Sequence, residues 1–244
     1  MTGPSLRPRP GTAIQQFSFV DALVAGLYEG AFRAAEVSAA GDLGLGCGDA
    51  LDGELVLLDG VLRVCRAGGV VSEVAPDELV PFAEVARFEP SHSETVARMT
   101  EKQFEAHVEA LVPSANLFYA LRLDGAFEWI QVREAVKQSA PFRPLAEAAR
   151  DQHEDTVGAG RATMVGFVGP DVFQGLSVAD FHLHVLDEAR AFGGHVLDFE
   201  IAEATLQIQA FSAFTVRLPE VASYLQAELD DMDADAAIRE VEGS

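Results

Sequence analysis

The chain has 244 residues, of which 49% are hydrophobic, and its formal net charge is −22. A chain of this length and composition folds around a core rather than staying disordered. The negative charge excludes nucleic acid and anionic membranes as partners, because both are bound through basic patches. An anionic small-molecule substrate would therefore need a local cation in its site.

The two cysteines, Cys47 and Cys65, do not form a C-x-x-C pair, which favours reduced thiols in the cytosol. Residues 1–16 contain prolines and arginines but no apolar segment typical of a signal peptide. No apolar run approaches the roughly 20 residues that cross a bilayer. We therefore expect a cytoplasmic protein.

The first half of the chain predicts a mobile N-terminal arm at residues 1–16 and an N-terminal β-rich domain at 17–115. Alternating apolar residues and Asp-Gly turn signals predict most of the strands, and Thr100 is the expected N-cap of the last helix. The expected elements are a strand at 14–19, a helix at 20–28, strands at 51–59, 61–66, 70–74 and 82–88, and a helix at 100–111. The strands between residues 42 and 88 are expected to form a β-meander.

The second half predicts a C-terminal β-rich, metal-binding domain at 116–236, followed by a tail at 237–244 that folds over the active site. Asp124-Gly125 is expected to turn the chain between two strands, and its likeness to Asp52-Gly53 suggests an internal duplication of a helix-plus-strands unit. The expected elements are strands at 117–123 and 127–136, a helix at 144–152, a polar loop at 152–160, strands at 161–168, 202–210 and 211–218, and a helix at 219–229. The fold class is α+β, with mixed sheets and few short helices.

Three of the six histidines lie within fourteen residues, at positions 182, 184 and 195. Alternating apolar residues on both sides of a turn signal predict a β-hairpin here. Side chains at i and i+2 share one face of a strand, so His182 and His184 project together and the turn returns His195 beside them. Three imidazoles with one open position are typical of a catalytic zinc site. The other histidines, His92, His107 and His153, are expected to be ordinary surface residues.

Two alternatives stay open at this point. His182-x-His184 followed by Glu188 fits the start of the first cupin motif, which predicts an Fe or Mn enzyme with Glu188 as a ligand. The glycines at 193 and 194 come too early for that motif, and no histidine follows His195 to complete the second one. The other alternative is a β-rich binding protein that holds zinc without catalysis.

From about Phe17 onward the chain resembles the α-acetolactate decarboxylase family. The resemblance rests on segments that occur in the family's order: 41–46 (GDLGLG), 51–54 (LDGE), Arg133 leading to Gln138 and 141–142 (PF), 166–167 before Pro170, His182-x-His184, 193–198 (GGHVLD), and Glu242. The two histidine segments are the specific ones. This resemblance implies decarboxylation of 2-acetolactate to acetoin and CO2 by a homodimer.

The resemblance also implies roles for individual residues. His182, His184 and His195 would bind Zn²⁺, and Arg133 would hold the substrate carboxylate of this 2-hydroxy-3-oxo acid through a bidentate fork. The metal would stabilise an enediolate as CO2 leaves. Glu54 or Glu242 would then protonate the enediolate. Glu240 is the close rival of Glu242, since both lie in the acidic tail.

Overall fold

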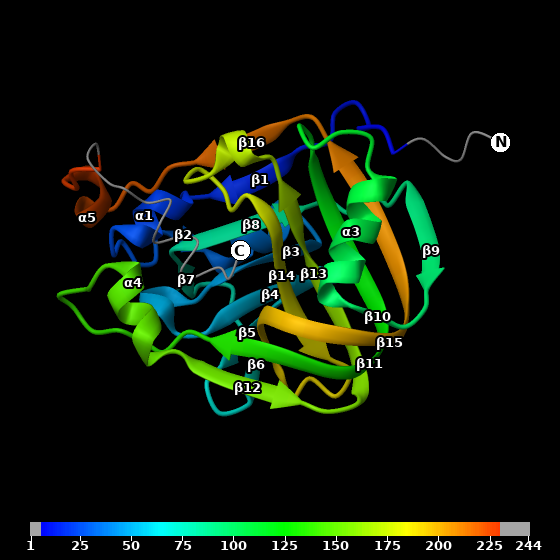
Figure 1. The fold of residues 1–244 in the computed structure, drawn as a ribbon. Helices are drawn as coiled ribbons and strands as arrows, with labels where there is room; N and C mark the ends of the chain where they lie inside the picture. Colours follow the sequence, from blue (N-terminus) through cyan, green and yellow to red (C-terminus); the bar gives the residue numbers. More distant parts are fainter. Residues whose placement is uncertain (1–5, 230–244) are drawn as a thin grey trace.

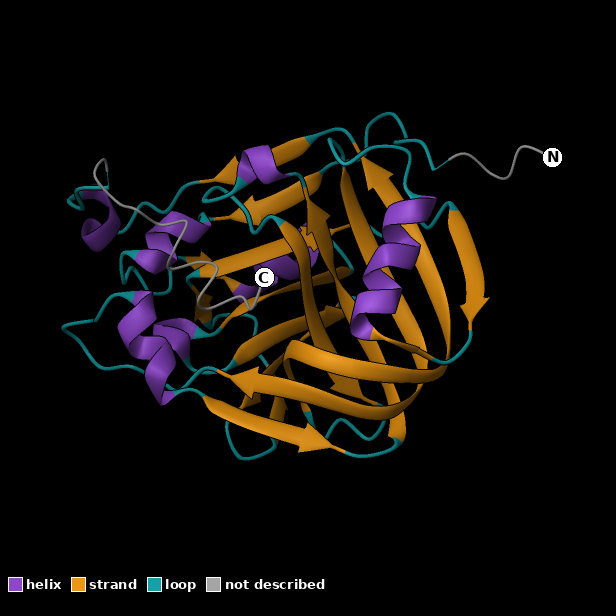
Figure 2. Cartoon of the chain, in the orientation of Figure 1, coloured by secondary structure: helices purple, strands orange, loops and turns teal. Residues whose placement is uncertain are grey.

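The computed structural model describes residues 6–229, in which strands far outnumber helices (Figures 1 and 2). The predicted α+β class, with mixed sheets and few short helices, is confirmed. The helices are α1 (Val20–Val24), α2 (Ala34–Ala40), α3 (Glu101–Leu111), α4 (Leu145–Ala148) and α5 (Ala222–Leu225), with 3-10 turns η1 (Asp49–Leu51), η2 (Ala149–Asp151) and η3 (Asp171–Phe173). Within the described chain no helix is both long and apolar enough to cross a membrane.

The first large sheet has seven strands within residues 6–229, in the order β16-β1-β8-β3-β4-β5-β6. Its strands are β1 (Ile14–Phe17), β3 (Leu43–Cys47), β4 (Glu54–Leu58), β5 (Val61–Arg66), β6 (Val70–Glu73), β8 (Phe82–Ala86) and β16 (Phe214–Arg217). A small separate sheet pairs β2 (Phe32–Arg33) with β7 (Leu79–Val80). Because β1 and β16 pair in parallel, this sheet joins the two ends of the described chain.

The second large sheet closes on itself. Its strands are β9 (His92–Val96), β10 (Met99–Thr100), β11 (Phe118–Glu134), β12 (His153–Val157), β13 (Gly160–Gly169), β14 (Asp180–Asp187) and β15 (Gly193–Phe211). β11 pairs with β13, β13 with β14, β14 with β15, and β15 again with β11. The closed circuit holds the histidine hairpin β14–β15 between long strands on both sides.

The main core lies between the two large sheets. Side chains from β3, such as Leu45, and from β13, such as Phe167, meet there with less than 3% of their surface exposed. A second core fills the closed sheet beneath α3, where Phe104 and Val108 are buried as their helical spacing predicts. The N-terminal end of α3 is capped as expected, with the Gln103 side chain accepting a hydrogen bond from the Thr100 N–H.

The predicted turn at Asp124-Gly125 is wrong, because β11 runs without a break from Phe118 to Glu134. Gly125 instead lies between Ala162 of β13 and Ala204 of β15, and a Cβ at this position would collide with Ala204. Glycine is therefore needed here because neighbouring strands approach closely, not because the chain turns. Asp124 accepts hydrogen bonds from neighbouring side chains within the sheet.

The loop expected at 152–160 is also partly wrong, since His153–Val157 forms β12. Its exposed, charged side chains mark an edge strand, where polarity does not exclude pairing. The meander is confirmed for β4, β5 and β6, but β8 returns to pair with β3 and β1. The expected helix at 20–28 ends at Val24, and the one at 219–229 is the single turn α5.

The domain boundaries stay predictions. Within the expected arm at 1–16, Leu6 is buried and Ile14 begins β1, so these residues are part of the folded structure. Residues 1–5 and 230–244, including the predicted tail at 237–244, lie outside the described residues.

Candidate active site and metal centre

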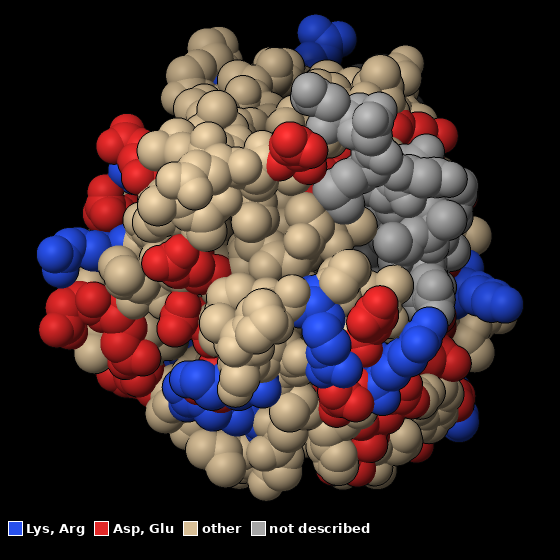
Figure 3. All heavy atoms as spheres, turned by 90° about the vertical axis from the view of Figure 1, so that its left-hand side faces the viewer, with Lys and Arg blue, Asp and Glu red and all other residues tan. Residues whose placement is uncertain are grey.

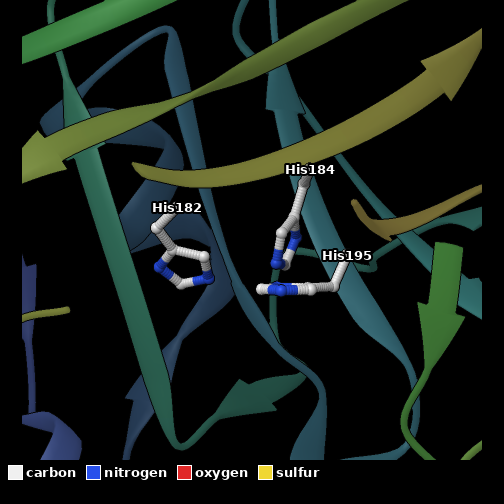
Figure 4. Close-up of side chains that lie close together, drawn as sticks. All are labelled: His182, His184 and His195. Carbon is white, nitrogen blue, oxygen red and sulfur yellow. The ribbon is translucent and has the colours of Figure 1, made fainter. Parts of the chain in front are cut away.

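The three histidines meet as the hairpin predicts. His184 of β14 and His195 of β15 are partners in register, and His182 lies two residues earlier on the same face. One ring nitrogen of each histidine lies within 4.8 Å of those of the other two. Figure 4 shows the three rings turned toward a common point, and all three residues are buried. Among the described residues, this is the group whose donor atoms converge as a metal site requires.

The protonation of two of the rings suits metal binding. His184 Nδ1 lies 2.8 Å from the carbonyl oxygen of Leu55, which only accepts hydrogen bonds. The ring proton is therefore on Nδ1, and Nε2 carries the lone pair that a metal takes. Burial, together with the nearby Arg133 charge, lowers the pKa of His182 to about 3, so this ring is neutral at physiological pH. Neutral imidazoles are the form that coordinates metals.

Glu54 stands at the start of β4, beside the histidines. Its Oε2 lies 3.7 Å from Nε2 of His184, and its Oε1 accepts a hydrogen bond from the N–H of Ala135 at 3.2 Å. The preceding Gly53 has φ +90°, and a Cβ there would meet the backbone of Cys65. Glycine is thus required at this turn, and it delivers the Glu54 carboxylate into the core rather than to the surface.

Arg133 reaches the site from β11. It is the register partner of His195 and is 5% exposed. A buried guanidinium needs anionic or carbonyl partners, because moving an unpaired charge out of water is costly. Arg133 and Glu54 line the same pocket as the three histidines. The site therefore brings together five of the six residues that the sequence assigned to it.

The pocket has one polar wall and several apolar ones. Its empty volume, which includes the open solvent at its mouth, is about 700 Å³. The apolar lining comes from helices as well as strands: Val20, Leu23, Leu51, Phe82, Val136, Leu145, Ala148 and Val178. On the molecular face that carries α1, α4 and α5, acidic and basic side chains both lie beside a broad uncharged area (Figure 3).

Sequence reasoning missed this apolar lining. The residues of α4 and the following turn, Leu145, Ala148 and Gln152, close one side of the pocket. Pro144 predicts the start of a short helix here but gives no sign of what the helix covers. Val178 precedes β14 by two residues and was not singled out either.

The comparison with known families decides the classification. The model of the family described as "Alpha-acetolactate decarboxylase" matches residues 14–231. The chain belongs to the alpha-acetolactate decarboxylase family. The predicted resemblance is confirmed, and so is the predicted enzyme class, a carboxy-lyase.

Named members of the alpha-acetolactate decarboxylase family match almost the whole chain. The protein from Methylococcus capsulatus is 40% identical, covering 93% of this chain and 87% of the relative. The protein from Bacillus subtilis strain 168 is 36% identical, covering 98% and 94%. The crystal structure of the latter superimposes with a TM-score of 0.92 over 95% of this chain and all of that one. A Staphylococcus aureus structure, described as similar to the family, also gives a TM-score of 0.92 at 33% identity.

The cupin-like arrangement is not formed in this decarboxylase-family fold. Glu188 follows the last residue of β14, its side chain is 74% exposed, and it lies 3.6 Å from Arg161. It is not among the residues of the histidine group. Glu188 as a metal ligand is therefore wrong, because the turn points it into solvent.

The remaining site predictions have separate outcomes. Glu242 and its rival Glu240 lie outside the described residues, so their roles stay predictions. His107 pairs with Glu94 at 2.6 Å, which agrees with an ordinary surface role. Cys47 and Cys65 are buried and form no disulfide with each other.

Proposed function

We propose that this protein decarboxylates 2-acetolactate to acetoin and CO2, with Zn²⁺ held by His182, His184 and His195. The observation that carries the proposal is one pocket in which these histidines, Glu54 and Arg133 share a polar wall. Three buried imidazoles match the donor set of a catalytic zinc site that keeps a position open. The bound metal supplies Lewis-acid stabilisation of the negative charge that develops as CO2 leaves.

Arg133 provides the cation that a negatively charged protein needs to attract an anionic substrate. Its planar guanidinium offers two parallel N–H donors to the substrate carboxylate, and its burial strengthens this pairing. The apolar walls suit the methyl groups of a small branched acid. They also exclude water, which favours departure of an uncharged CO2 from a charged carboxylate.

Glu54 is placed for the proton transfer that follows. Its carboxyl group lies beside the histidines and is held by the Ala135 N–H, so it is oriented rather than mobile. We propose that a carboxyl group here delivers the proton to the carbon that has lost CO2. Glu54 is the candidate among the described residues, and Glu242 is the candidate in the C-terminal tail.

The direct test is an acetoin assay with racemic 2-acetolactate. Dialysis against a chelator is expected to abolish acetoin release, and added zinc to restore it. Recovery with manganese or iron but not zinc would contradict the choice of metal. Folded, zinc-loaded protein that releases no acetoin would reject the activity and favour the alternative of a catalytically degenerate, zinc-holding binding protein.

We further propose that the protein acts in the cytoplasm as a homodimer in acetoin biosynthesis. Two buried cysteines that form no disulfide support a reducing compartment. The homodimer comes from the family resemblance, and sedimentation equilibrium of the purified protein tests it. A monomer at all concentrations would contradict it.

A further inference from the structure

Glu84 is a buried carboxyl group that the proposed reaction does not use. It lies on β8 with 1% of its surface exposed, between its register partners Gln16 on β1 and Leu45 on β3. On the same face of β8, two residues earlier, Phe82 lines the pocket. The Glu84 side chain therefore stands in the core between the sheets, next to the pocket wall.

The hydrogen-bonding groups around Glu84 include more acceptors than donors. Its Oε2 accepts from the Ser177 hydroxyl at 3.0 Å. Gln16 donates through Nε2 to the carbonyl oxygens of Ser18 at 2.9 Å and Leu176 at 2.7 Å, which fixes the orientation of its amide. Oε1 of Gln16 and Oε1 of Glu84 are both buried acceptors, and neither has a donor among the described residues.

A single proton satisfies both of these acceptors. Register partners on antiparallel strands place their side chains on one face, about 5 Å apart at Cβ. A protonated Glu84 is a donor, and its register partner Gln16 offers an unmatched acceptor on that face. An ionised Glu84 would instead leave two acceptors opposed in an apolar core, at a high cost in free energy.

The surroundings agree with a neutral acid. Burial raises the pKa of Glu84 to about 8, against the opposing effect of the Ser177 hydrogen bond. β1 brings no ionisable side chain, and β3 brings only the thiol of Cys47. From α1, Asp21 packs against the connection at Gly175, and α1 brings no basic side chain. On β13 the one ionisable residue, Arg161, is 62% exposed at the far end of the strand.

Gln16 and Glu84 together fix the chain that leads into the metal-binding hairpin. Residues 174–179 connect η3 to β14, and Gln16 binds the carbonyl of Leu176 while Glu84 binds the hydroxyl of Ser177. The next residue, Val178, lines the pocket, and His182 follows four residues later. Gln16 and Glu84 therefore connect the first large sheet to the segment that leads into β14, the strand of His182 and His184.

We propose that Glu84 is a positioning residue that acts as a neutral carboxylic acid, donating to Gln16 and accepting from Ser177 to hold Val178 in the pocket wall. The kinetic part of this inference rests on the proposed function. The protonation state does not, since it is measured on the folded protein alone.

The first test compares Glu84→Gln with the wild type by thermal unfolding as a function of pH. The amide in this variant donates to Gln16 and accepts from Ser177 at every pH. In the wild type, a carboxyl whose folded pKa exceeds its unfolded pKa contributes stability that is fully present below the unfolded value and is lost as pH rises. The Tm of Glu84→Gln minus that of the wild type is therefore expected to increase from about pH 5 to about pH 8 and then level off. A difference that is constant over this range would overturn the proposal.

The second test separates positioning from bulk stability. Glu84→Gln is expected to keep kcat and KM within roughly twofold of the wild type at pH 6.5, because it preserves both hydrogen bonds. Glu84→Met fills similar space without them, and its KM is expected to rise roughly three- to tenfold with a smaller change in kcat. Ser177→Ala, which removes one of the bonds, is expected to raise KM in the same direction.

An unchanged KM in Ser177→Ala and Glu84→Met, or a loss in Glu84→Gln as large as in Glu84→Met, would refute positioning. If Glu84→Met does not fold, Ser177→Ala and the pH dependence of Glu84→Gln still decide the question. Absence of acetoin from the wild type would reject the proposed function and leave the thermal result standing.

Discussion

The imidazole of His184 donates a hydrogen bond from Nδ1 to the carbonyl oxygen of Leu55 at 2.8 Å, across 129 residues of sequence. This contact joins β14 of the closed sheet to β4 of the other sheet. Glu54, the residue before Leu55, lies with Oε2 3.7 Å from the opposite nitrogen of the same ring. One contact between sheets therefore sets both the orientation of a proposed metal ligand and the place of the proposed acid.

Alanine at His182 or His195 is expected to remove the metal. Two imidazoles do not complete a zinc site, so the bound zinc should fall from about one equivalent to less than about a tenth. Metal content of the purified variants measures this. His153→Ala is the matched control, because this histidine is exposed on β12, and it should keep its zinc. Full zinc content in His195→Ala would contradict the ligand assignment.

Glu54→Gln is expected to lower kcat by roughly 10²- to 10⁴-fold while the metal is retained. The amide oxygen still accepts the Ala135 N–H, so the fold should be preserved, but no proton is available for transfer. Acetoin release and zinc content are measured on the same sample. Glu188→Gln serves as the control and should change neither. Activity close to the wild type in Glu54→Gln would move the proton transfer to the C-terminal tail.

Arg133 is expected to bind the substrate carboxylate. Arg133→Lys keeps the charge but loses the bidentate fork, and kcat/KM should fall roughly tenfold; Arg133→Met should lose roughly 100-fold or more. Arg150→Met is the control, since Arg150 is exposed on η2. Steady-state kinetics with 2-acetolactate measure all three. Equal kcat/KM for Arg133→Met and the control would show that the carboxylate is held elsewhere.

Gly166→Ala is expected to disturb β14, the strand that carries His182 and His184. A Cβ at Gly166 would collide with the backbone carbonyl of His182, which cannot move without shifting β14. We expect a loss of about 1–3 kcal/mol in the free energy of unfolding, together with weaker zinc binding. Gly158→Ala is the matched control, because nothing lies within 4 Å of a Cβ there. Urea unfolding and chelator competition measure the two effects, and equal behaviour of the variants would count against this close packing.

Substitutions can distinguish the roles of Glu240 and Glu242. Glu242→Gln is expected to lower kcat by at least roughly tenfold if the tail reaches the site as the family resemblance implies. Glu240→Gln should leave kcat nearly unchanged. Removal of residues 237–244 should resemble Glu242→Gln. If Glu240→Gln lowers kcat and Glu242→Gln does not, Glu240 rather than Glu242 takes the proposed role.

Much of the site was predictable because local geometry creates it. The alternation around His182 and His184 and the turn before His195 determine that three imidazoles share a face, and the structure confirms their register. Glu54 and Arg133 could not be found in this way, since each sits alone in its own segment. Only the resemblance to a known family placed them in the site.

The errors come from local signals that tertiary context overrode. Asp124-Gly125 has the chemistry of a turn, yet β13 and β15 pair with β11 on both sides and keep the strand extended. Residues 153–157 are polar enough for a loop, yet the last part of β11 offers an open edge for them to pair with. Backbone hydrogen bonds formed with distant strands outweigh turn propensity in both cases.

The sequence by itself determined the class of fold, the histidine hairpin and the family. Only the tertiary structure decided that the two sheets meet at His184 and Leu55, that α4 and Val178 wall the pocket, and that Glu84 is buried opposite Gln16. The physical reason is that alternation and turn chemistry act over a few residues, whereas burial and hydrogen-bond satisfaction depend on strands brought together from distant parts of the chain.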